Sequence, residues 1–168
     1  MSNPDAPAPT PTPGTTREIL VDALNVAWWC GAPPSLRLPV ALLTALLRRG
    51  DQAWLYFDAS APHQLAHEQA DYAALMRACP DRVVQVPSGR TADRLLLRHA
   101  RARAAVIVSR DRFRDHRARY RRLIDDPSRL IGGDVDADVL RVPGLELWTP
   151  LTHSSTEALE ALREIARG

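Results

Sequence analysis

Four short apolar segments, each followed by a segment with helical periodicity, constrain the fold of this chain more than any other feature of its sequence. The segments of strand length are 18–22, 53–57, 82–86 and 104–108, and the helical patterns that follow them are 39–49, 67–79, 91–103 and 109–122. Parallel strands need crossover connections, which are usually helices that cover both faces of the sheet. The alternation therefore predicts an α/β domain in three layers, with a central, mainly parallel sheet flanked by helices.

The two ends of the chain depart from this alternation. Residues 1–16 are dominated by proline and small polar residues, which predicts a disordered or polyproline-like tail. Residues 17–168 are then expected to form a single domain. The remaining predicted elements are a hairpin whose strands, 130–131 and 139–142, flank the loop "GGDVDAD", a short strand at 145–148, and a final helix that Ser154 and Glu157 begin with a capping box.

The basic residues are unevenly distributed. The chain contains no lysine, and between Arg82 and Arg122 there are thirteen arginines but only three acids. Such a local excess attracts a polyanion such as RNA or DNA, although a solvated basic face would have the same composition. Cys30 and Cys79 lack the spacing of a metal site or a disulfide framework, and no segment is long and apolar enough for a membrane span. A cytoplasmic protein that does not contact a membrane is expected.

Acidic side chains follow the predicted strands at the points where the strands end. Asp22 ends the first strand, Asp58 ends the second, and Asp93 begins the helix after the third. Asp111 and Asp115 are four residues apart, so they are expected on one face of the helix after the fourth strand. Each acid taken alone could be a helix cap or a surface residue. Because ligands bind beyond the carboxyl ends of parallel strands, the sequence predicts a shared pocket at this edge of the sheet.

A pocket of this kind needs a cation, because unpaired carboxylates in it repel one another. Ligands that are all oxygen atoms suit Mg²⁺ or Mn²⁺. An ion there would lower the pKa of a bound water and stabilise the charge that develops when a phosphodiester is displaced. The predicted metal ligands are Asp22, Asp93, Asp111, Asp115 and Asn25, the last of which follows the first strand by three residues.

Three motifs, in this order along the chain, resemble those of the NYN-domain nucleases within the PIN-like superfamily. They are "ILVDALNVAWW" (19–29), "TADRLLLRHA" (91–100) and "VIVSRDRFRDH" (106–116). The third is close to a motif of the Regnase-type (Zc3h12a-like) ribonuclease branch. The resemblance covers about residues 18–148. It implies a PIN-like α/β fold with a Mg²⁺-dependent acidic site that cleaves single-stranded RNA.

The resemblance also implies roles for individual residues. Asp22, Asp93 and Asp111 match the catalytic, metal-binding acids of the family, and Asn25 and Asp115 match residues that complete or orient the shell of the ion. The expected activity is that of an endoribonuclease that uses Mg²⁺, or Mn²⁺ in its place, and leaves 5′-phosphate and 3′-hydroxyl ends. Single-stranded RNA is the expected partner, and a homodimer is compatible with the sequence. The candidates for contacts with the RNA backbone are Arg90, Arg94, Arg112, Arg114 and Arg117.

Two positions depart from the pattern of the family. Ala92 stands where the first acid of a pair is usual, and Arg110 replaces the asparagine before Asp111. Asp58 is a candidate for a substitute acid. The missing carboxylate leaves open a second function, that of a catalytically weak or inactive RNA-binding NYN module. A third function, a small-molecule phosphotransfer enzyme with Asp22 as nucleophile, is disfavoured because the Asp-x-Asp pattern of such enzymes is absent.

Histidines and tryptophans near the acids are further candidates for ligand contacts. His63 and His67 have the spacing of a metal-binding pair, but no third ligand and no His-Glu-x-x-His pattern accompany them, so zinc is not expected. His63 could instead contact an RNA phosphate. Trp28 or Trp29 could stack on a base, a contact worth about 1–3 kcal/mol, and at least one of them is expected to pack in the core.

Overall fold

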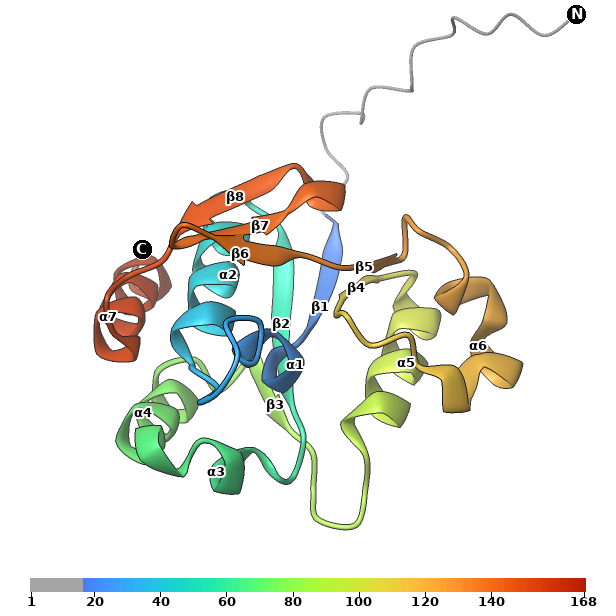
Figure 1. Ribbon diagram of the computed structural model, residues 1–168, viewed down its shortest axis with the longest axis horizontal. Helices are drawn as coiled ribbons and strands as arrows, with labels where there is room; N and C mark the ends of the chain where they lie inside the picture. The colour runs from blue at the N-terminus through green and yellow to red at the C-terminus, as the bar shows by residue number, and fades with distance from the viewer. Residues whose placement is uncertain (1–16) are drawn as a thin grey trace, which may run out of the picture.

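The computed structural model describes residues 17–168, and the Pro-rich tail predicted for residues 1–16 lies outside the described residues. Its centre is a five-stranded, parallel sheet with the strand order β3-β2-β1-β4-β5 (Figure 1). This arrangement confirms the predicted α/β class and the mainly parallel sheet. The strands of this sheet are β1 (Glu18–Asp22), β2 (Gln52–Phe57), β3 (Val83–Gln85), β4 (Val106–Val108) and β5 (Leu130–Ile131).

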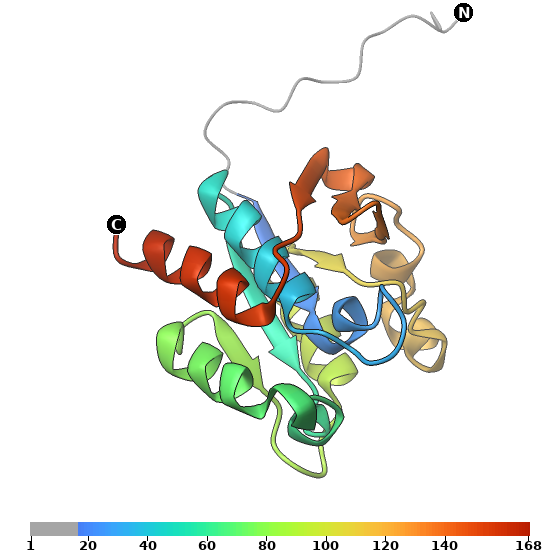
Figure 2. The ribbon, with the colours of Figure 1, turned by 60° about the vertical axis from the view of Figure 1, so that its left-hand side comes forward.

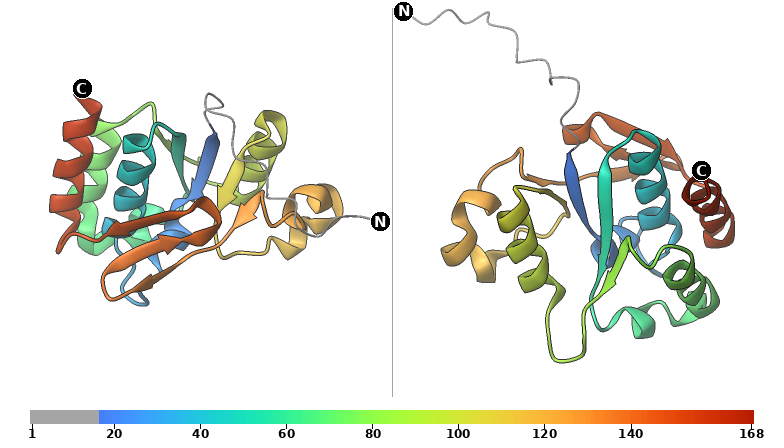
Figure 3. Two further views of the ribbon diagram at one scale, coloured as in Figure 1. Left: turned by 90° about the horizontal axis from the view of Figure 1, so that it is seen from above. Right: turned by 180° about the vertical axis from the view of Figure 1, so that it is seen from behind.

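Helices cover both faces of the sheet, as the alternation predicted. On one face α2, α4 and α7 bury an aliphatic core that includes Leu42, Leu55 and Leu159. On the other face α5 and α6 bury a smaller core (Figures 2 and 3). The helices are α1 (Ala23–Ala27), α2 (Arg37–Arg48), α3 (Ala61–Gln64), α4 (Gln69–Ala78), α5 (Ala92–Arg103), α6 (Arg117–Ile124) and α7 (Ser155–Ala166), with short 3₁₀ turns η1 (Ala66–Glu68), η2 (Arg114–His116) and η3 (Pro143–Leu145).

A second, antiparallel sheet is formed by β6 (Asp134–Asp136), β7 (Val139–Val142) and β8 (Leu147–Pro150). The predicted hairpin is therefore present, but its first strand is β6 rather than residues 130–131. Those two residues form β5, which pairs in parallel with β4 at the edge of the main sheet. The buried Ile131 lies beside Val108 in this pairing, so the apolar pair completes the sheet instead of turning back on itself.

Local chemistry explains where several helices begin and end. Gly50, with φ +88°, follows α2, and its amide donates to the carbonyl oxygen of Leu47, as in a C-terminal glycine cap. The hydroxyl of Ser154 accepts a hydrogen bond from the amide of Glu157 at the start of α7, which confirms the predicted N-cap. The Glu157 carboxylate accepts from the amide of His153 rather than from that of Ser154, so the reciprocal bond of the capping box is displaced by one residue.

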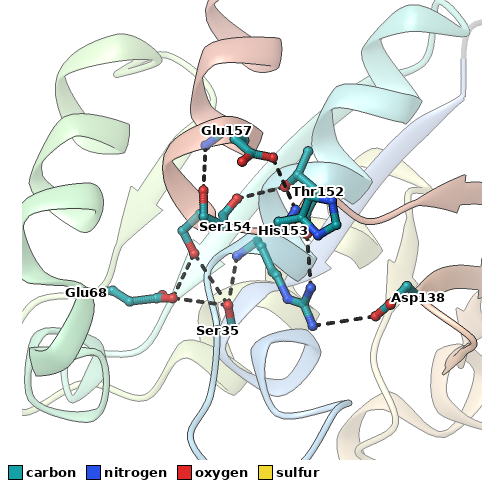
Figure 4. A network of polar contacts seen from close by, with 9 residues as sticks. Ser35, Glu68, Asp138, Thr152, His153, Ser154 and Glu157 are labelled. Carbon is teal, nitrogen blue, oxygen red and sulfur yellow. Dashed lines mark hydrogen bonds and ion pairs between the residues drawn. The ribbon is translucent and has the colours of Figure 1, made fainter.

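The N-terminus of α7 is also attached to the rest of the domain by a polar network around Glu68 (Figure 4). One carboxylate oxygen of Glu68 accepts from the hydroxyls of Ser35 and Ser155, at 3.1 and 2.8 Å, and the other accepts from the amide of Leu36 at 2.7 Å. Because these groups come from three segments far apart in the sequence, the network fixes α7 beside α2 and η1. The network stabilises the fold and includes none of the predicted site residues.

The segment 109–122 differs from its prediction. A helix was expected from its start, but residues 109–113 are a loop, η2 follows, and α6 begins only at Arg117. Asp111 and Asp115 therefore do not share a helix face, and the predicted i,i+4 arrangement is wrong. The physical reason is that Ser109 and Asp111 bond to nearby backbone amides, which competes with helix formation.

None of the helices in residues 17–168 is both long and apolar enough to cross a bilayer.

Candidate active site at the carboxyl edge of the sheet

The strand order places a crevice between the carboxyl ends of β1 and β4. The connection from β1 leads to β2 on one side, whereas the chain reaches β4 on the other side through α5. Such a switch point is where open α/β sheets bind ligands. Asp22 is the last residue of β1, and Ser109 follows β4 directly. The two residues meet across the crevice, so the predicted shared edge exists.

Asp22 is the most perturbed acid of the site. Its Oδ2 accepts a hydrogen bond of 2.8 Å from the hydroxyl of Ser109. The pKa of Asp22 is raised to about 7, mainly by burial; the Ser109 bond acts to lower the pKa, and the negative charges of Asp93 and Asp111 act to raise it. At neutral pH this carboxyl group is thus poised between its two protonation states, a condition typical of functional sites.

Asp93 lies in the first turn of α5, where a carboxylate is favoured by the helix dipole. Its pKa is nevertheless raised, first by burial and then by the negative charge of Asp111. Asp58 and Asp115 add smaller contributions in the same direction, and His116 acts in the opposite direction. The structure therefore brings Asp22, Asp93 and Asp111 within electrostatic reach of one another.

Asp111 is positioned by the loop that replaced the predicted helix. Its amide donates to the Ser109 hydroxyl at 3.0 Å, and its Oδ1 accepts from the amide of Phe113 at 2.8 Å. Phe113 is buried in the smaller core and adopts a left-handed conformation with φ 49°, which is unfavourable for a residue with a side chain. Burial of the phenylalanine ring thus holds an unusual turn that carries Asp111.

Asn25 links the two strand ends from the other side. Its side-chain oxygen accepts from the indole of Trp29 at 3.1 Å and from the backbone amide of Arg110 at 2.9 Å. The Arg110 guanidinium lies 4.8 Å above the Trp29 ring and donates to the carbonyl oxygen of Gly133 at 2.7 Å. Both acceptor positions of the Asn25 oxygen are used, so the predicted role of metal ligand would require one of these bonds to break.

Ser109 and the backbone of Arg110 are site residues that sequence reasoning missed. Ser109 bridges two acids, because its hydroxyl donates to Asp22 and accepts from the amide of Asp111. A polar residue directly after a buried strand and two residues before an acid was the available indication. Its position at the end of β4, opposite Asp22, becomes evident only from the pairing of β1 with β4.

The acids of this edge form a set of oxygen ligands without a bound positive partner. In the part of the chain that the structure describes, none of Asp22, Asp93 and Asp111 forms an ion pair. Within the same residues, no three His, Cys, Asp or Glu side chains converge closely enough to hold one ion. Mg²⁺ is usually bound by one or two carboxylates together with waters and substrate phosphate, so a pair from this set fits it.

The two remaining predicted acids are peripheral. Asp115 is exposed in η2, and its charge only contributes to the raised pKa of Asp93. Asp58 accepts from the amides of Ser60 and Ala92, at 3.0 and 3.3 Å, so it caps the start of α5, where the hydroxyl of Thr91, the residue at the N-cap position, makes no such bond. Burial favours a higher pKa for Asp58, but these amide bonds, together with the side chain of Ser60, outweigh it and lower the pKa.

The predicted RNA-binding arginines divide between two cavities. Arg112, Arg114 and Arg117 line a cavity of about 1070 Å³ that also includes Asp111 and Ser109. Arg90 and Arg94 line a separate cavity of about 450 Å³ beside α5. Arg117 is the exception among the five, because its guanidinium forms two hydrogen bonds with Asp125, at 2.9 and 3.0 Å, and its charge is largely offset.

The aromatic and histidine candidates also separate. Trp29 is buried, whereas Trp28 is 42% exposed and its indole donates to Gln64 at 3.0 Å, so only Trp28 presents a ring to a ligand. His67 is hydrogen-bonded to the carbonyl oxygen of Pro34 at 2.9 Å and His63 is exposed. No zinc site forms around them in residues 17–168, since no suitable group of ligands is present there.

A family model described as the Zc3h12a-like ribonuclease NYN domain matches residues 15–143. The chain belongs to this family. The membership confirms the resemblance of the three motifs, and the matched region of this NYN domain contains all the acids of the site. It supports an RNA nuclease function with RNA as substrate. Neither the family match nor the structure of residues 17–168 supports the homodimer.

Among solved structures, the NYN domain resembles Arabidopsis thaliana nuclear protein-only RNase P 2 (PRORP2), with a TM-score of 0.57 and 15% sequence identity. The match covers 77% of this chain and 30% of that protein, so the chain spans less than a third of its length. At this identity the likeness shows the fold alone, and it confirms the PIN-like architecture. No curated protein matches the sequence.

Proposed function

We propose that this NYN domain is a metal-dependent endoribonuclease that cleaves single-stranded RNA. The observation that carries the proposal is the group of three carboxylates at the β1–β4 switch point. They have no ion-pair partner in residues 17–168 and lie next to an arginine-lined cavity. A group of acids beside a basic surface suits a site that must hold a cation and a phosphodiester together.

Each residue of the site has a distinct role in this proposal. Two of the three acids Asp22, Asp93 and Asp111 would hold Mg²⁺ or Mn²⁺ directly, and the third would add negative charge beside the ion. The ion, when bound, lowers the pKa of a coordinated water and offsets charge on the phosphate. Ser109 orients Asp22 through its 2.8 Å hydrogen bond. Arg112 and Arg114 are placed to bind phosphates that flank the cleaved bond. The cytoplasmic location stays a prediction from the sequence.

The proposal is tested by incubating the pure protein with single-stranded RNA, with and without Mg²⁺ or Mn²⁺, alongside a single-stranded DNA. Cleavage of RNA should require the metal. Asp22→Asn and Asp111→Asn should each reduce the rate at least about 100-fold, because each removes part of an interaction worth several kcal/mol in the transition state. The matched control is Asp134→Asn, which changes an acid of the small sheet. Cleavage at the wild-type rate by both site variants would exclude the proposal.

A second candidate function is that of an RNA-binding NYN module with little or no turnover. It is favoured by position 92, where the family pattern expects an acid. Ala92 is 4% exposed. The carboxylate of Asp58, the candidate substitute acid, already accepts a hydrogen bond from the amide of Ala92. This function predicts RNA binding that weakens with salt, without metal-dependent cleavage. Ala92→Asp should then create or raise cleavage, whereas an active wild-type protein would need no such change.

A further inference from the structure

A second basic surface runs along α5 and α6. We call it the α5–α6 groove. Two cavities, of about 450 and 560 Å³, form it and meet at Arg119 and Tyr120. Eight arginines line it, of which Arg90 and Arg129 lie outside the two helices and six belong to them, namely Arg94, Arg98 and Arg101 from α5 and Arg119, Arg121 and Arg122 from α6. None of these six lines the cavity next to the acidic site.

Helical spacing produces this wall. Arg94, Arg98 and Arg101 are separated by four and three residues, so they project from one side of α5. Tyr120 lies between the two helices and is 6% exposed. The guanidinium groups of Arg101 and Arg119 lie 4.7 and 5.7 Å from the centre of its ring. These cation–π contacts hold two arginines, one from each helix, against the same ring in the groove.

The groove differs from the acidic site in having no acids among its lining residues. Within residues 17–168, Arg121 is the one arginine of the six that forms an ion pair, at 3.4 Å from Asp125. The other five line one groove that has no carboxylate among its lining residues, so their like charges favour an anion in the groove. Arginine favours phosphate through its planar pairs of donors, so a chain of phosphates is the ligand that this surface fits.

The groove also leads away from the acids. Arg94 directly follows Asp93 at the carboxyl edge of the sheet, and Arg101 lies eight residues beyond Asp93 in the same helix. At 1.5 Å per residue this is a distance of about 12 Å along the helix axis. Stacked nucleotides rise about 3.4 Å each, so the span corresponds to roughly three or four nucleotides. An RNA strand that leaves the acidic site beside Arg94 can therefore continue along α5.

We propose that the α5–α6 groove is a second RNA-binding site, which holds the phosphate backbone of a segment several nucleotides away from the cleaved bond. The inference rests on the proposed function for its substrate class. The groove adds affinity for long RNAs without contributing to the chemistry. The groove thus favours RNAs long enough to extend past the acidic site, and it does not distinguish their bases.

The test compares two RNAs of about 4 and about 16 nucleotides, lengths that fill one site or extend past it. Binding is measured in EDTA, which prevents metal-dependent cleavage. The groove variant carries Arg101→Gln, Arg119→Gln and Arg122→Gln. The matched control variant carries Arg77→Gln in α4, Arg163→Gln in α7 and Arg167→Gln directly after α7. Circular dichroism melting verifies that both variants fold. If the triple variant does not fold, the single variant Arg122→Gln replaces it in the binding measurements.

For the groove variant, the Kd of the long RNA should rise about 10–100-fold, and the slope of log Kd against log salt should fall by about 2. The Kd of the short RNA should change less than about twofold, and the control variant should match the wild type. An unchanged Kd for the long RNA, or equal losses for both RNAs, would overturn the proposal. Mg²⁺-dependent cleavage of the short RNA by the wild type tests the proposed function separately. A length-dependent loss of binding without any cleavage supports the groove and contradicts the endonuclease.

Discussion

The aspartates of the small sheet and of the carboxyl edge differ in whether an arginine neutralises their charge. Asp134 forms a 2.6 Å ion pair with Arg141, and this partner lowers the pKa of Asp134. Asp22 and Asp93 have raised pKa values, although arginines are abundant in the neighbouring segment. Arg110, which lies beside the acids, bonds to Gly133 instead. The small sheet thus neutralises its aspartate within the protein, whereas the negative charge at the carboxyl edge has no such partner in residues 17–168.

This contrast divides stability from function. A paired carboxylate on the surface contributes little to stability and needs no ligand. A buried, unpaired carboxylate makes the folded state less favourable when it is ionised. The carboxyl edge therefore has a cost in folding free energy, which the binding of a cation would offset under the proposed function. Three predictions test this division, beginning with the largest expected effect.

The largest effect concerns stability without metal. The rise in the pKa of Asp22 from 3.8 to about 7 means that ionisation of this group destabilises the folded state relative to the unfolded state, and the full cost is present above about pH 7. Asp22→Asn should then stabilise the metal-free protein at pH 8 by about 2 kcal/mol, half the upper bound of about 4 that this rise implies, because the side chain is partly solvated. The gain should shrink as pH falls from about 7 to 4, because Asp22 of the unfolded wild-type chain, which is ionised at pH 7, becomes protonated over this range as it already is in the folded state.

The measurement is urea unfolding in EDTA at pH 4, 6 and 8. Asp134→Asn is the control, and it should give no gain because it removes a partner of Arg141 instead of an unpaired charge. An Asp22→Asn variant that is no more stable than the wild type at pH 8 would contradict the contrast between the two regions.

A smaller effect is expected from the hydroxyl that bridges the acids. Ser109→Ala removes the hydrogen bond that lowers the pKa of Asp22, so this pKa should rise from its value of about 7. If cleavage requires the ionised carboxylate, its rate at pH 7 should fall about tenfold and recover at higher pH, since one pH unit corresponds to a factor of ten. The pH profile of the cleavage rate checks this.

Ser128→Ala is the matched control, because the hydroxyl of Ser128 donates to an aspartate, Asp126, outside the site. Its pH profile should coincide with that of the wild type. A Ser109→Ala protein with a lower rate but an unshifted profile would show that Ser109 supports the fold and not the ionisation of Asp22.

The smallest effect is expected at Asp58, which lies between the two kinds of aspartate. It is bonded to two amides, yet its charge also raises the pKa of Asp93. Asp58→Asn should raise the Mg²⁺ concentration for half-maximal cleavage about threefold, in keeping with a partly screened charge. A loss of about 100-fold or more would instead identify Asp58 as a direct ligand, and no change would remove it from the site.

Most elements of the fold were predictable because their periodicity is local. The strands β1 to β4 and the helices α2, α4, α5 and α7 follow from apolar patterns and end residues such as Gly50 and Ser154. Residues 109–116 could not be predicted in this way. Their conformation depends on Phe113 reaching a core formed by α5 and the sheet, and on side chains that compete for backbone amides.

The site was predictable only in part, for a related reason. The rule that ligands bind at the carboxyl ends of strands placed Asp22, Asp93 and Asp111 at one edge, and the structure brings their charges within reach of one another there. The rule does not reveal which side-chain oxygens are already bonded. The bond from Arg110 to Asn25 and the bridge made by Ser109 depend on pairing between segments about 85 residues apart, which no local pattern encodes.

Gly133 shows how far sensitivity to substitution can extend beyond the reacting groups. A Cβ atom at this position would lie 2.7 Å from the Trp29 ring and even closer to the carbonyl oxygen of Arg141, both too near for any side chain. The carbonyl oxygen of Gly133 accepts a hydrogen bond from the Arg110 guanidinium, and the amide of Arg110 donates to the Asn25 side chain. A survey of random substitutions would therefore mark position 133 as intolerant in the same way as Asp22. In this domain, a map of mutational tolerance would outline the support of the active site together with its chemistry.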